Sequence, residues 1–268
     1  MDTVERYYDE SAEAEWGRLE RHRVEYGITL RALAEYLPPV PARVADIGGG
    51  PGRYAIGLAR QGYQVTLVDV SAESLALARR RAGEAGVGLE SIVHADGRDL
   101  PALPDEGFDA VLLMGPLYHL VEREERLRAV CEAHRILRPG GCVFASFIGR
   151  YAPIQDAAVA RPEHLAERPD DEAAILATGV YRRPEGGGFV DAWFAHPSEV
   201  QPLMAQGGFR IRALLACEPL VYAREERISA APPELHERWL DLLYRLARDP
   251  SILGASGHLL YVGWKPGR

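Results

Sequence analysis

The chain is poor in cysteine and in long apolar runs, and each shortage excludes a class of protein. Only three of its 268 residues are cysteine, and no two of them form a CxxC pair, so we expect neither a disulfide framework nor a metal site. No apolar run reaches the roughly 18 residues of a membrane-spanning helix, so we expect no membrane attachment. Residues 1–16 are polar and acidic, unlike a secretory signal, and a cytoplasmic location is expected.

An excess of positive charge is also missing. The formal net charge is −8 at pH 7, which provides no general attraction to a phosphate backbone, so we expect no nucleic-acid partner. The basic stretches 21–23 and 79–81 have the pattern of solvated helix faces and are assigned no function. Hydrophobic residues make up 47% of the chain and charged residues 26%, as in ordinary globular proteins, so a single core is expected.

Short β-rich segments alternate with helical segments in the first half of the chain, which predicts parallel strands covered by helices. Two N-terminal helices precede this alternation and end before Pro38. The expected strands are 43–47, 64–70, 89–94, 108–114 and 142–148, with helices between them that end near 61, 83 and 137. The first half therefore predicts an α/β fold.

The alternation breaks after Gly149. Helices separated by Pro162 and Pro169, a glycine run at 186–188 and a strand-like segment at 189–195 predict an inserted cap. A helix, a strand, a second helix and a last strand complete the chain, at 197–206, 209–215, 233–248 and 258–264.

A glycine loop follows the first expected core strand in the segment Asp46-Ile47-Gly48-Gly49-Gly50-Pro51-Gly52. Its glycines allow the backbone to approach a ligand closely. The spacing is G-x-G-x-G, and Arg53 stands where the dinucleotide fingerprint needs a small residue. The Asp46 carboxylate repels pyrophosphate and suits an ammonium or sulfonium group. These features favour a cationic ligand, whereas the simpler alternative is a tight turn without a ligand.

Two further carboxylates follow the next two strands. Asp69 ends the strand 64–70 and can accept hydrogen bonds from both hydroxyls of a ribose, although it can instead cap the next helix, a role that Ser71 also suits. Asp96, in a loop before Gly97, can accept from the exocyclic amine of adenine, with the Gly97 N–H meeting a ring nitrogen. A plain turn is the alternative for this pair.

These motifs, together with Phe108-Asp109-Ala110-Val111 and Leu137-Arg138-Pro139-Gly140-Gly141, resemble in order those of class I S-adenosylmethionine-dependent methyltransferases. The resemblance covers about residues 42–148. It implies a Rossmann-like seven-stranded sheet of order 3-2-1-4-5-7-6 with its last strand antiparallel. It also implies an N-terminal helical lid (1–40), a cofactor-binding core (41–149), a cap insertion (150–195) and a C-terminal part of the core (196–268) with a helical insertion near 223–257.

The resemblance also implies S-adenosyl-L-methionine as the cofactor, with a role for each motif. Gly48, Gly50 and Gly52, with Asp46 and Met114, would surround the methionyl part of this cofactor. Asp69 and Val70 would hold its ribose, and Asp96 with Gly97 its adenine. Tyr8, which with Tyr7 precedes the first clear helix in the sequence pattern, would belong to a lid over the sulfonium.

The methyl acceptor is expected over the loop 115–119, because ligands of such sheets lie beyond the carboxyl ends of the strands. Methyl transfer from a sulfonium depends mainly on positioning, so a base is not required. If a proton must leave the acceptor, His119 is the candidate base, although a histidine that only hydrogen-bonds a neighbouring segment is the alternative. Tyr118, His119 and Trp193 are the expected acceptor-binding residues.

A small-molecule methyltransferase is therefore the favoured function. A nicotinamide-dependent oxidoreductase is disfavoured by Arg53 and Asp46. An RNA or protein methyltransferase and a non-catalytic S-adenosylmethionine-binding module remain as alternatives. The acceptor atom and the oligomeric state are left open.

Overall fold

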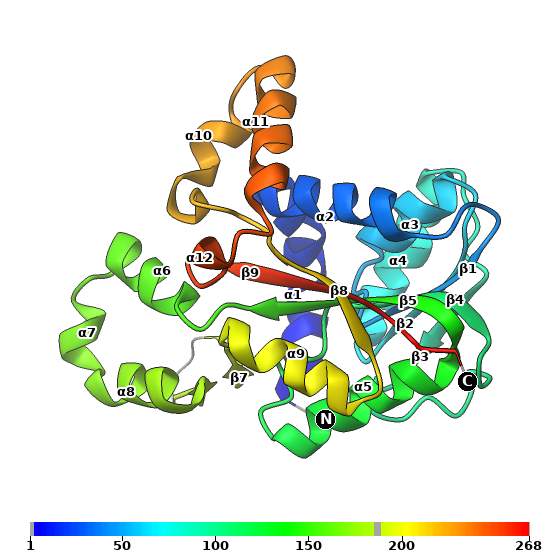
Figure 1. Cartoon of the computed structure of the whole chain (residues 1–268), viewed down its shortest axis with the longest axis horizontal. Coiled ribbons are helices and arrows are strands. Elements are labelled where there is room, and N and C mark those ends of the chain that lie inside the picture. The colour runs from blue at the N-terminus through cyan, green and yellow to red at the C-terminus, as the bar shows by residue number, and fades with distance from the viewer. Residues whose placement is uncertain (1–2, 185–188, 268) are drawn as a thin grey trace.

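A seven-stranded sheet forms the centre of the computed structural model, which describes residues 3–184 and 189–267 (Figure 1). The strand order is β3-β2-β1-β4-β5-β9-β8, and β9 runs antiparallel to both of its neighbours. The predicted order 3-2-1-4-5-7-6 is confirmed, since β8 and β9 are the sixth and seventh strands of this sheet. The strands are β1 (Arg43–Ile47), β2 (Gln64–Asp69), β3 (Ser91–His94), β4 (Phe108–Leu113), β5 (Leu137–Ile148), β8 (Arg210–Ala216) and β9 (His258–Trp264).

Helices cover both faces of the sheet and create two apolar cores. Side chains alternate along each strand, so neighbours such as Val143 and Phe144 in β5 enter different cores. One face is covered by α5 (Arg123–Ile136) and α9 (Pro197–Gln206). The other face is covered by α2 (Arg23–Tyr36), α3 (Arg53–Arg60), α4 (Ala72–Glu84) and α11 (Pro233–Leu246).

The N-terminal segment differs from the sequence-based expectation. The first helix, α1 (Thr3–Arg21), already contains Tyr7 and Tyr8, so the prediction that this pair precedes the first helix is wrong. The polar sequence hides the helix because its stabilising contacts are tertiary: Glu13 pairs with Arg80 and Arg81 of α4. These two arginines therefore dock α1, a function that the sequence pattern did not reveal.

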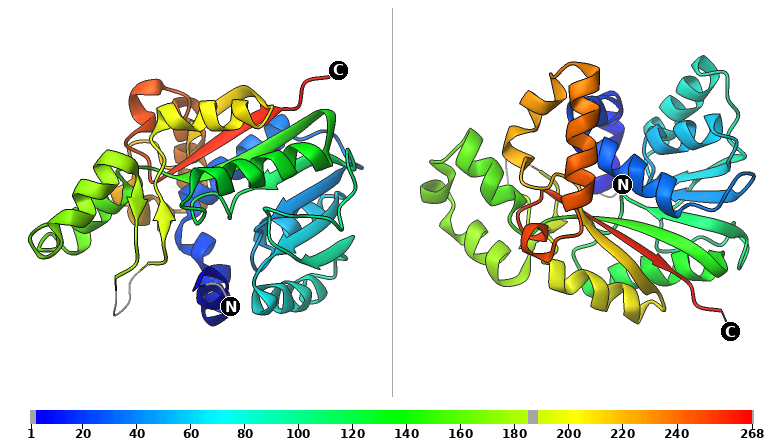
Figure 2. Two further views of the ribbon diagram at one scale, coloured as in Figure 1. Left: turned by 90° about the horizontal axis from the view of Figure 1, so that it is seen from below. Right: turned by 45° about the horizontal axis from the view of Figure 1, so that its top comes forward.

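The cap projects from the end of the molecule opposite β3 (Figure 2). Pro162 and Pro169 separate its helices as expected. The strand-like segment 189–195 contributes only a two-residue strand, and the predicted glycine run at 186–188 lies outside the described residues. The cap elements are α6 (Ala152–Ala160), α7 (His164–Glu167), α8 (Pro169–Thr178), β6 (Val180–Tyr181) and β7 (Ala192–Trp193).

A second insertion lies between β8 and β9, on the upper side of the molecule in Figure 1. Besides α11, it contains η1 (Tyr222–Arg224), α10 (Glu225–Ser229) and α12 (Pro250–Leu253).

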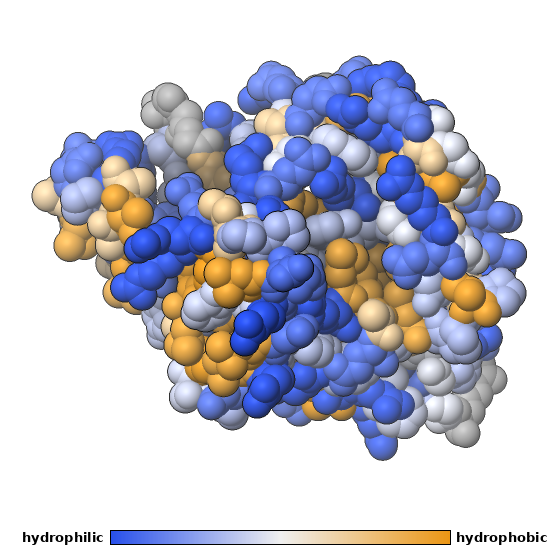
Figure 3. All heavy atoms as spheres, turned by 90° about the horizontal axis from the view of Figure 1, so that it is seen from above, coloured by the Kyte–Doolittle hydropathy of each residue, from blue (hydrophilic) through white to orange (hydrophobic). Residues whose placement is uncertain are grey.

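Figure 3, the view from above, shows a mostly polar surface with separate apolar patches. No helix in the described part of the chain is long and apolar enough to cross a membrane.

Buried charges join the N-terminal helices to the antiparallel edge of the sheet. His258, at the start of β9, lies 2.7 Å from Glu218 and 3.7 Å from Glu25 of α2. Both glutamates are buried, and their charges raise the pKa of His258 to about 9 although burial opposes this. Arg18 of α1 binds Glu25 through two hydrogen bonds of 2.7 and 2.9 Å. The cluster therefore balances its charges only when His258 is protonated.

The stability of the protein should consequently depend on pH through His258. The folded pKa exceeds the unfolded value, so this stabilisation is complete below about pH 6.5 and is lost as the pH rises through about 9. His258→Gln should lower the free energy of unfolding at pH 7 by roughly 1 to 3 kcal/mol. The difference between the variant and the wild type should shrink toward pH 10, measured by urea unfolding. An unchanged difference across this range would contradict the assignment.

Candidate functional site

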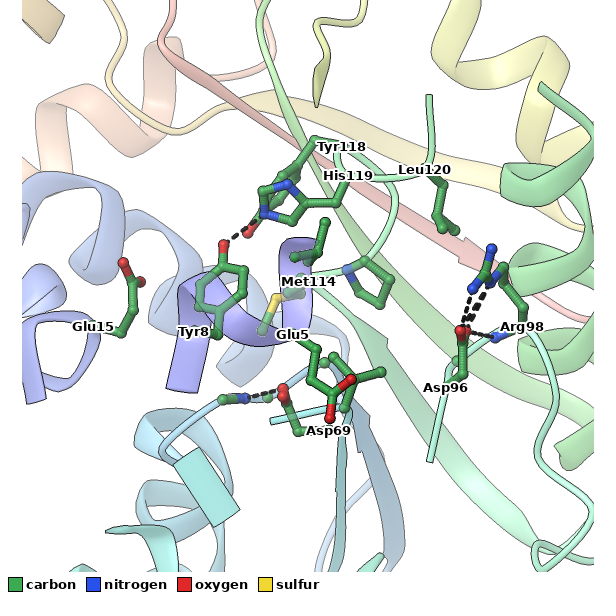
Figure 4. A pocket seen from close by; sticks show the side chains of 18 of the residues that line it. Glu5, Tyr8, Glu15, Asp69, Asp96, Arg98, Met114, Tyr118, His119 and Leu120 are labelled. Atoms are coloured by element: carbon green, nitrogen blue, oxygen red, sulfur yellow. Dashed lines mark hydrogen bonds and ion pairs between the residues drawn. The ribbon is translucent and has the colours of Figure 1, made fainter. Parts of the chain in front are cut away.

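A cavity of about 840 Å³ lies at the carboxyl ends of β1, β2, β3 and β4, beneath α1. Asp96 and Arg98 lie at one end, and Glu15 and Tyr8 lie at the other (Figure 4). Because parallel strands end at the same edge, residues from distant parts of the sequence meet on its wall. The volume of the cavity is sufficient for an extended ligand together with a second, small molecule.

The glycine loop after β1 forms the floor of this cavity. Gly48 and Gly50 line it, and both have left-handed backbone conformations, with φ of 69° and 54°. A Cβ atom on Gly115 would lie 2.2 Å from the Gly48 carbonyl oxygen, so the loops after β1 and β4 touch through their backbones. Gly52, at φ 82°, precedes α3 and is not among the residues that line the cavity.

Asp46 is a buried carboxylate without a compensating cation. Only 1% of the residue is exposed, and among the described residues its carboxylate interacts with the Ala55 backbone N–H but has no side-chain donor. Burial, and then the charge of Asp69, raise its pKa to about 7. An ammonium group in the cavity would supply both the positive charge and the hydrogen bonds that this carboxylate lacks.

Asp69 faces the cavity from the end of β2. Its Oδ2 accepts from the Gly50 N–H and its Oδ1 from the Ser71 N–H, both at 2.8 Å. Burial raises the pKa of Asp69, and these N–H groups oppose the rise. Each oxygen keeps a second lone pair, so the carboxylate can still receive two hydroxyls. The alternative that Asp69 caps α4 is wrong, because the Ser71 hydroxyl accepts from the Ser74 N–H at 3.0 Å.

Asp96 and Arg98 form the opposite end of the cavity. The Arg98 Nε lies 3.0 and 2.9 Å from the two Asp96 oxygens, and the Arg98 guanidinium also bonds Glu125 at 2.6 Å. These contacts lower the pKa of Asp96 against the effect of burial. Sequence reasoning missed Arg98, although its place two residues after Asp96 offered the signal. Any adenine at this end would meet the Asp96–Arg98 pair rather than a single carboxylate.

Helix α1 closes over the cavity through contacts on both sides. The Tyr8 hydroxyl lies 2.6 Å from His119 Nε2 in the loop after β4, and Asp9 accepts from the Ser71 hydroxyl at 2.7 Å. Trp16 lies between two guanidinium groups, 4.8 Å from Arg53 and 5.1 Å from Arg81. Trp16 thus packs on charged side chains of the core and does not line the cavity, whereas Tyr8 does.

Trp193 is not part of the cavity wall, so its predicted role as an acceptor contact needs correction. Its ring is 5% exposed and packs against Phe147 and the Arg126 guanidinium, which lies 3.8 Å from the ring centre. Its backbone N–H donates to the Tyr118 carbonyl at 2.8 Å, so it supports the loop that carries Tyr118 and His119. The predicted residues that do line the cavity are Tyr8, Asp46, Gly48, Gly50, Asp69, Val70, Asp96, Gly97, Met114, Tyr118 and His119.

Comparison with known proteins places these features in a family. A methyltransferase-domain family model matches residues 44–141. The ubiquinone biosynthesis O-methyltransferase of Xanthomonas axonopodis pv. citri (strain 306) is 34% identical over 184 residues, which cover 69% of this chain and 69% of that protein. The enzyme of the same name from Xylella fastidiosa (strain 9a5c) is 33% identical, over 69% of this chain and 67% of that protein.

Solved structures share the fold. A SAM-dependent methyltransferase from Methanosarcina mazei has a TM-score of 0.62 at 20% identity, over 88% of this chain and 98% of its own. A Thermotoga maritima methyltransferase, described as a possible histamine N-methyltransferase, has a TM-score of 0.60 at 20% identity, over 96% of this chain and 98% of its own. The sequence relatives and the fold agree with the acidic, glycine-lined cavity, and the chain belongs to the class I S-adenosylmethionine-dependent methyltransferases.

Proposed function

We propose that the protein transfers the methyl group of S-adenosylmethionine to a hydroxyl of a small molecule bound at the Glu15 end of the cavity. The observation that carries this proposal is the continuity of the cavity, which runs from Asp96 past Asp46 and Asp69 to Glu15 under α1. A covered cavity of about 840 Å³ suits a small guest rather than a macromolecule. The names of the sequence relatives favour oxygen as the acceptor atom.

The cavity wall offers a partner for each part of the cofactor. Asp46 would hold the ammonium, because its buried carboxylate needs a cation. Gly48 and Gly50 leave room for the methionyl chain, beside Met114. Asp69 and Val70 would hold the ribose, and Asp96 with Gly97 the adenine. The bound sulfonium supplies an activated methyl group for in-line displacement, so the task of the protein is to orient the acceptor and exclude water.

Aromatic rings surround the acceptor end. His119 makes edge contacts with Tyr8 and Tyr118, with ring centres 5.3 and 4.6 Å apart, and its ring centre lies 5.7 Å from that of Phe189 of the cap. Burial raises the pKa of both tyrosines, so their phenols stay neutral and can donate or accept a hydrogen bond. Such walls favour a flat, ring-shaped acceptor.

His119 is better suited to position α1 than to serve as the base. Its Nε2 is engaged by the Tyr8 hydroxyl at 2.6 Å, and its Nδ1 is buried below the cavity surface. If Nε2 accepts, its lone pair is occupied, and if it donates, it has no lone pair for an incoming proton. We therefore assign the Tyr8–His119 pair to closure of the cavity.

The function can be tested with the purified protein. Calorimetry should show binding of S-adenosylhomocysteine, the demethylated cofactor. Incubation with S-adenosylmethionine and a panel of catechols and simple phenols should give products heavier by one methylene unit in mass spectrometry. Cofactor binding without methylation of any panel member would refute the proposed acceptor class but not the family.

Asp46→Asn should have opposite effects on cofactor binding and on stability. The affinity for S-adenosylhomocysteine should fall about 10- to 100-fold, because a charge-assisted hydrogen bond contributes roughly 1.5 to 3 kcal/mol. The stability of the ligand-free protein at pH 7.5 should rise, because the raised pKa of Asp46 costs the folded wild type stability as pH rises from about 4 through about 7. Calorimetry and urea unfolding measure the two effects. Affinity for adenosine, which lacks the ammonium, should change little and serves as the control.

Tyr8→Phe and His119→Asn should each weaken S-adenosylhomocysteine binding by roughly 3- to 10-fold, because either change removes the same hydrogen bond. The double variant should bind S-adenosylhomocysteine no more weakly than the single variant of lower affinity, since the two side chains act through one contact. Calorimetry on all four proteins provides this double-mutant cycle. Additive losses would mean that the two residues act separately.

A further inference from the structure

Glu15 is a carboxylate on the cavity wall for which the cofactor has no evident use. It belongs to α1 and lies at the end of the cavity opposite Asp96 and Arg98 (Figure 4). Asp46, Asp69 and Asp96 already match the charged and polar parts of the cofactor. The Glu15 side chain is 24% exposed, so a molecule in the cavity can reach it. Glu15 therefore faces the space that remains for the methyl acceptor.

A fixed cation stands beside Glu15. The Arg18 Nε lies 3.7 Å from a Glu15 oxygen, one turn further along α1. Glu25 binds the two terminal nitrogens of Arg18 at 2.7 and 2.9 Å and so holds the guanidinium in place. Glu25 is itself buried and lies 3.7 Å from the charged His258. Residues from three elements, α1, α2 and β9, thus fix the geometry around one cavity-facing carboxylate.

The other polar side chains at this end are poor proton acceptors. Tyr8 and Tyr118 are phenols whose pKa values are raised by burial, so they remain protonated. His119 presents only an Nε2 atom that Tyr8 already engages. Arg18 is a cation and has no lone pair to offer. Glu5, the other α1 carboxylate on the wall, lies toward Asp69 rather than toward Tyr118 (Figure 4).

We propose that Glu15 is the catalytic base that removes the proton from the acceptor hydroxyl, and that Arg18 is its positioning residue. This inference rests on the proposed function. In the step, the O–H bond of the acceptor breaks and its proton passes to a Glu15 oxygen. The acceptor oxygen forms its bond to the methyl carbon as the bond from that carbon to sulfur breaks, leaving a neutral thioether. Glu15 afterwards returns the proton to solvent, and no other reactant is needed.

The electrostatics at Glu15 suit this role. Burial raises its pKa, and this effect outweighs the opposing influence of the cations around it. A carboxylate with a raised pKa is a stronger base than an ordinary one, while the charge of Arg18 opposes the rise and so favours the ionised form. The charged and titratable groups that face it are Arg18, Arg21 and His22 from α1 and its end, Glu25 from α2, Tyr7 and Tyr8 from α1, and Tyr118 from the loop after β4.

The test compares Glu15→Gln with Glu10→Gln, an equal change of charge at an exposed position of the same helix. The probes are catechol and 4-nitrocatechol with S-adenosylmethionine. Wild-type kcat should rise with pH along an acidic limb, because only ionised Glu15 accepts a proton. Glu15→Gln should lower kcat about 10²- to 10⁴-fold and remove this limb. Glu10→Gln should keep the wild-type kcat and its acidic limb. Glu15→Asp should recover part of the rate, with the limb present.

A spectroscopic measurement separates base chemistry from a structural effect. 4-Nitrocatechol bound to the enzyme with S-adenosylhomocysteine should develop its phenolate absorption band at a pH shifted from that in buffer, because the phenol and Glu15 titrate as a coupled pair, and Glu15→Gln should abolish this shift. A loss of kcat under about tenfold, or a larger loss with the acidic limb and the phenolate shift retained, would overturn the assignment. If the wild type neither binds nor methylates these probes while it binds S-adenosylhomocysteine, the proposed acceptor class fails and the base assignment fails with it.

Discussion

A carboxylate buried at the end of β1 is the constraint on which the rest of the site depends. Asp46 is placed there by the backbone of a central strand, between β2 and β4, and only 1% of the residue is exposed, at the cavity wall. An isolated buried charge is costly, and the nearby charge of Asp69 adds to the cost. Under the proposed function, the ammonium of the bound cofactor would remove this cost. Affinity for the cofactor would then be gained from instability in its absence.

The order of the strands converts this single constraint into an extended site. β3, β2, β1 and β4 lie side by side and end at the same edge, so the loops after them line the cavity in that order. Under the proposed function they would supply the adenine, ribose, methionyl and acceptor regions in turn. The contact of Gly48 with Gly115 sets how closely the middle two loops approach. Side chains larger than hydrogen at either position would push these loops apart. The order of the regions along the cavity therefore follows directly from the order of the strands in the sheet.

The part of the site that the sequence predicted comes from local motifs. Asp46 and Asp69 lie in the last two residues of the buried strands β1 and β2, and Asp96 lies two residues after β3, so each marks a strand end that is recognisable from its neighbours in the chain. Trp193 was wrongly assigned to the cavity because an aromatic residue near a cap looks alike whether it packs inward or outward. Its true partner, the Arg126 guanidinium, belongs to α5, far from Trp193 in the sequence.

The contacts around α1 could not be predicted for the same reason. Glu15 and Arg18 are one turn apart in α1, but Glu25 and His258 come from α2 and β9, and no spacing rule connects these two residues to α1. The polar sequence of α1 gives little sign of a helix by itself, because its partners on α4 and the sheet edge are contributed by the folded core. Local pattern was therefore enough to predict the residues at the Asp96 end of the cavity, whereas tertiary packing brings together those at the Glu15 end.

The position of β9 has a consequence for how the chain is made. This strand is the last in the sequence, yet it lies between β5 and β8 and hydrogen-bonds to both. During synthesis β5 and β8 emerge from the ribosome without the strand that joins them, and each exposes an unpaired edge until β9 arrives. The residues proposed to hold the cofactor all precede β5, so the nascent chain can form that half of the sheet first and must keep its open edges from pairing with other chains until β9 is made.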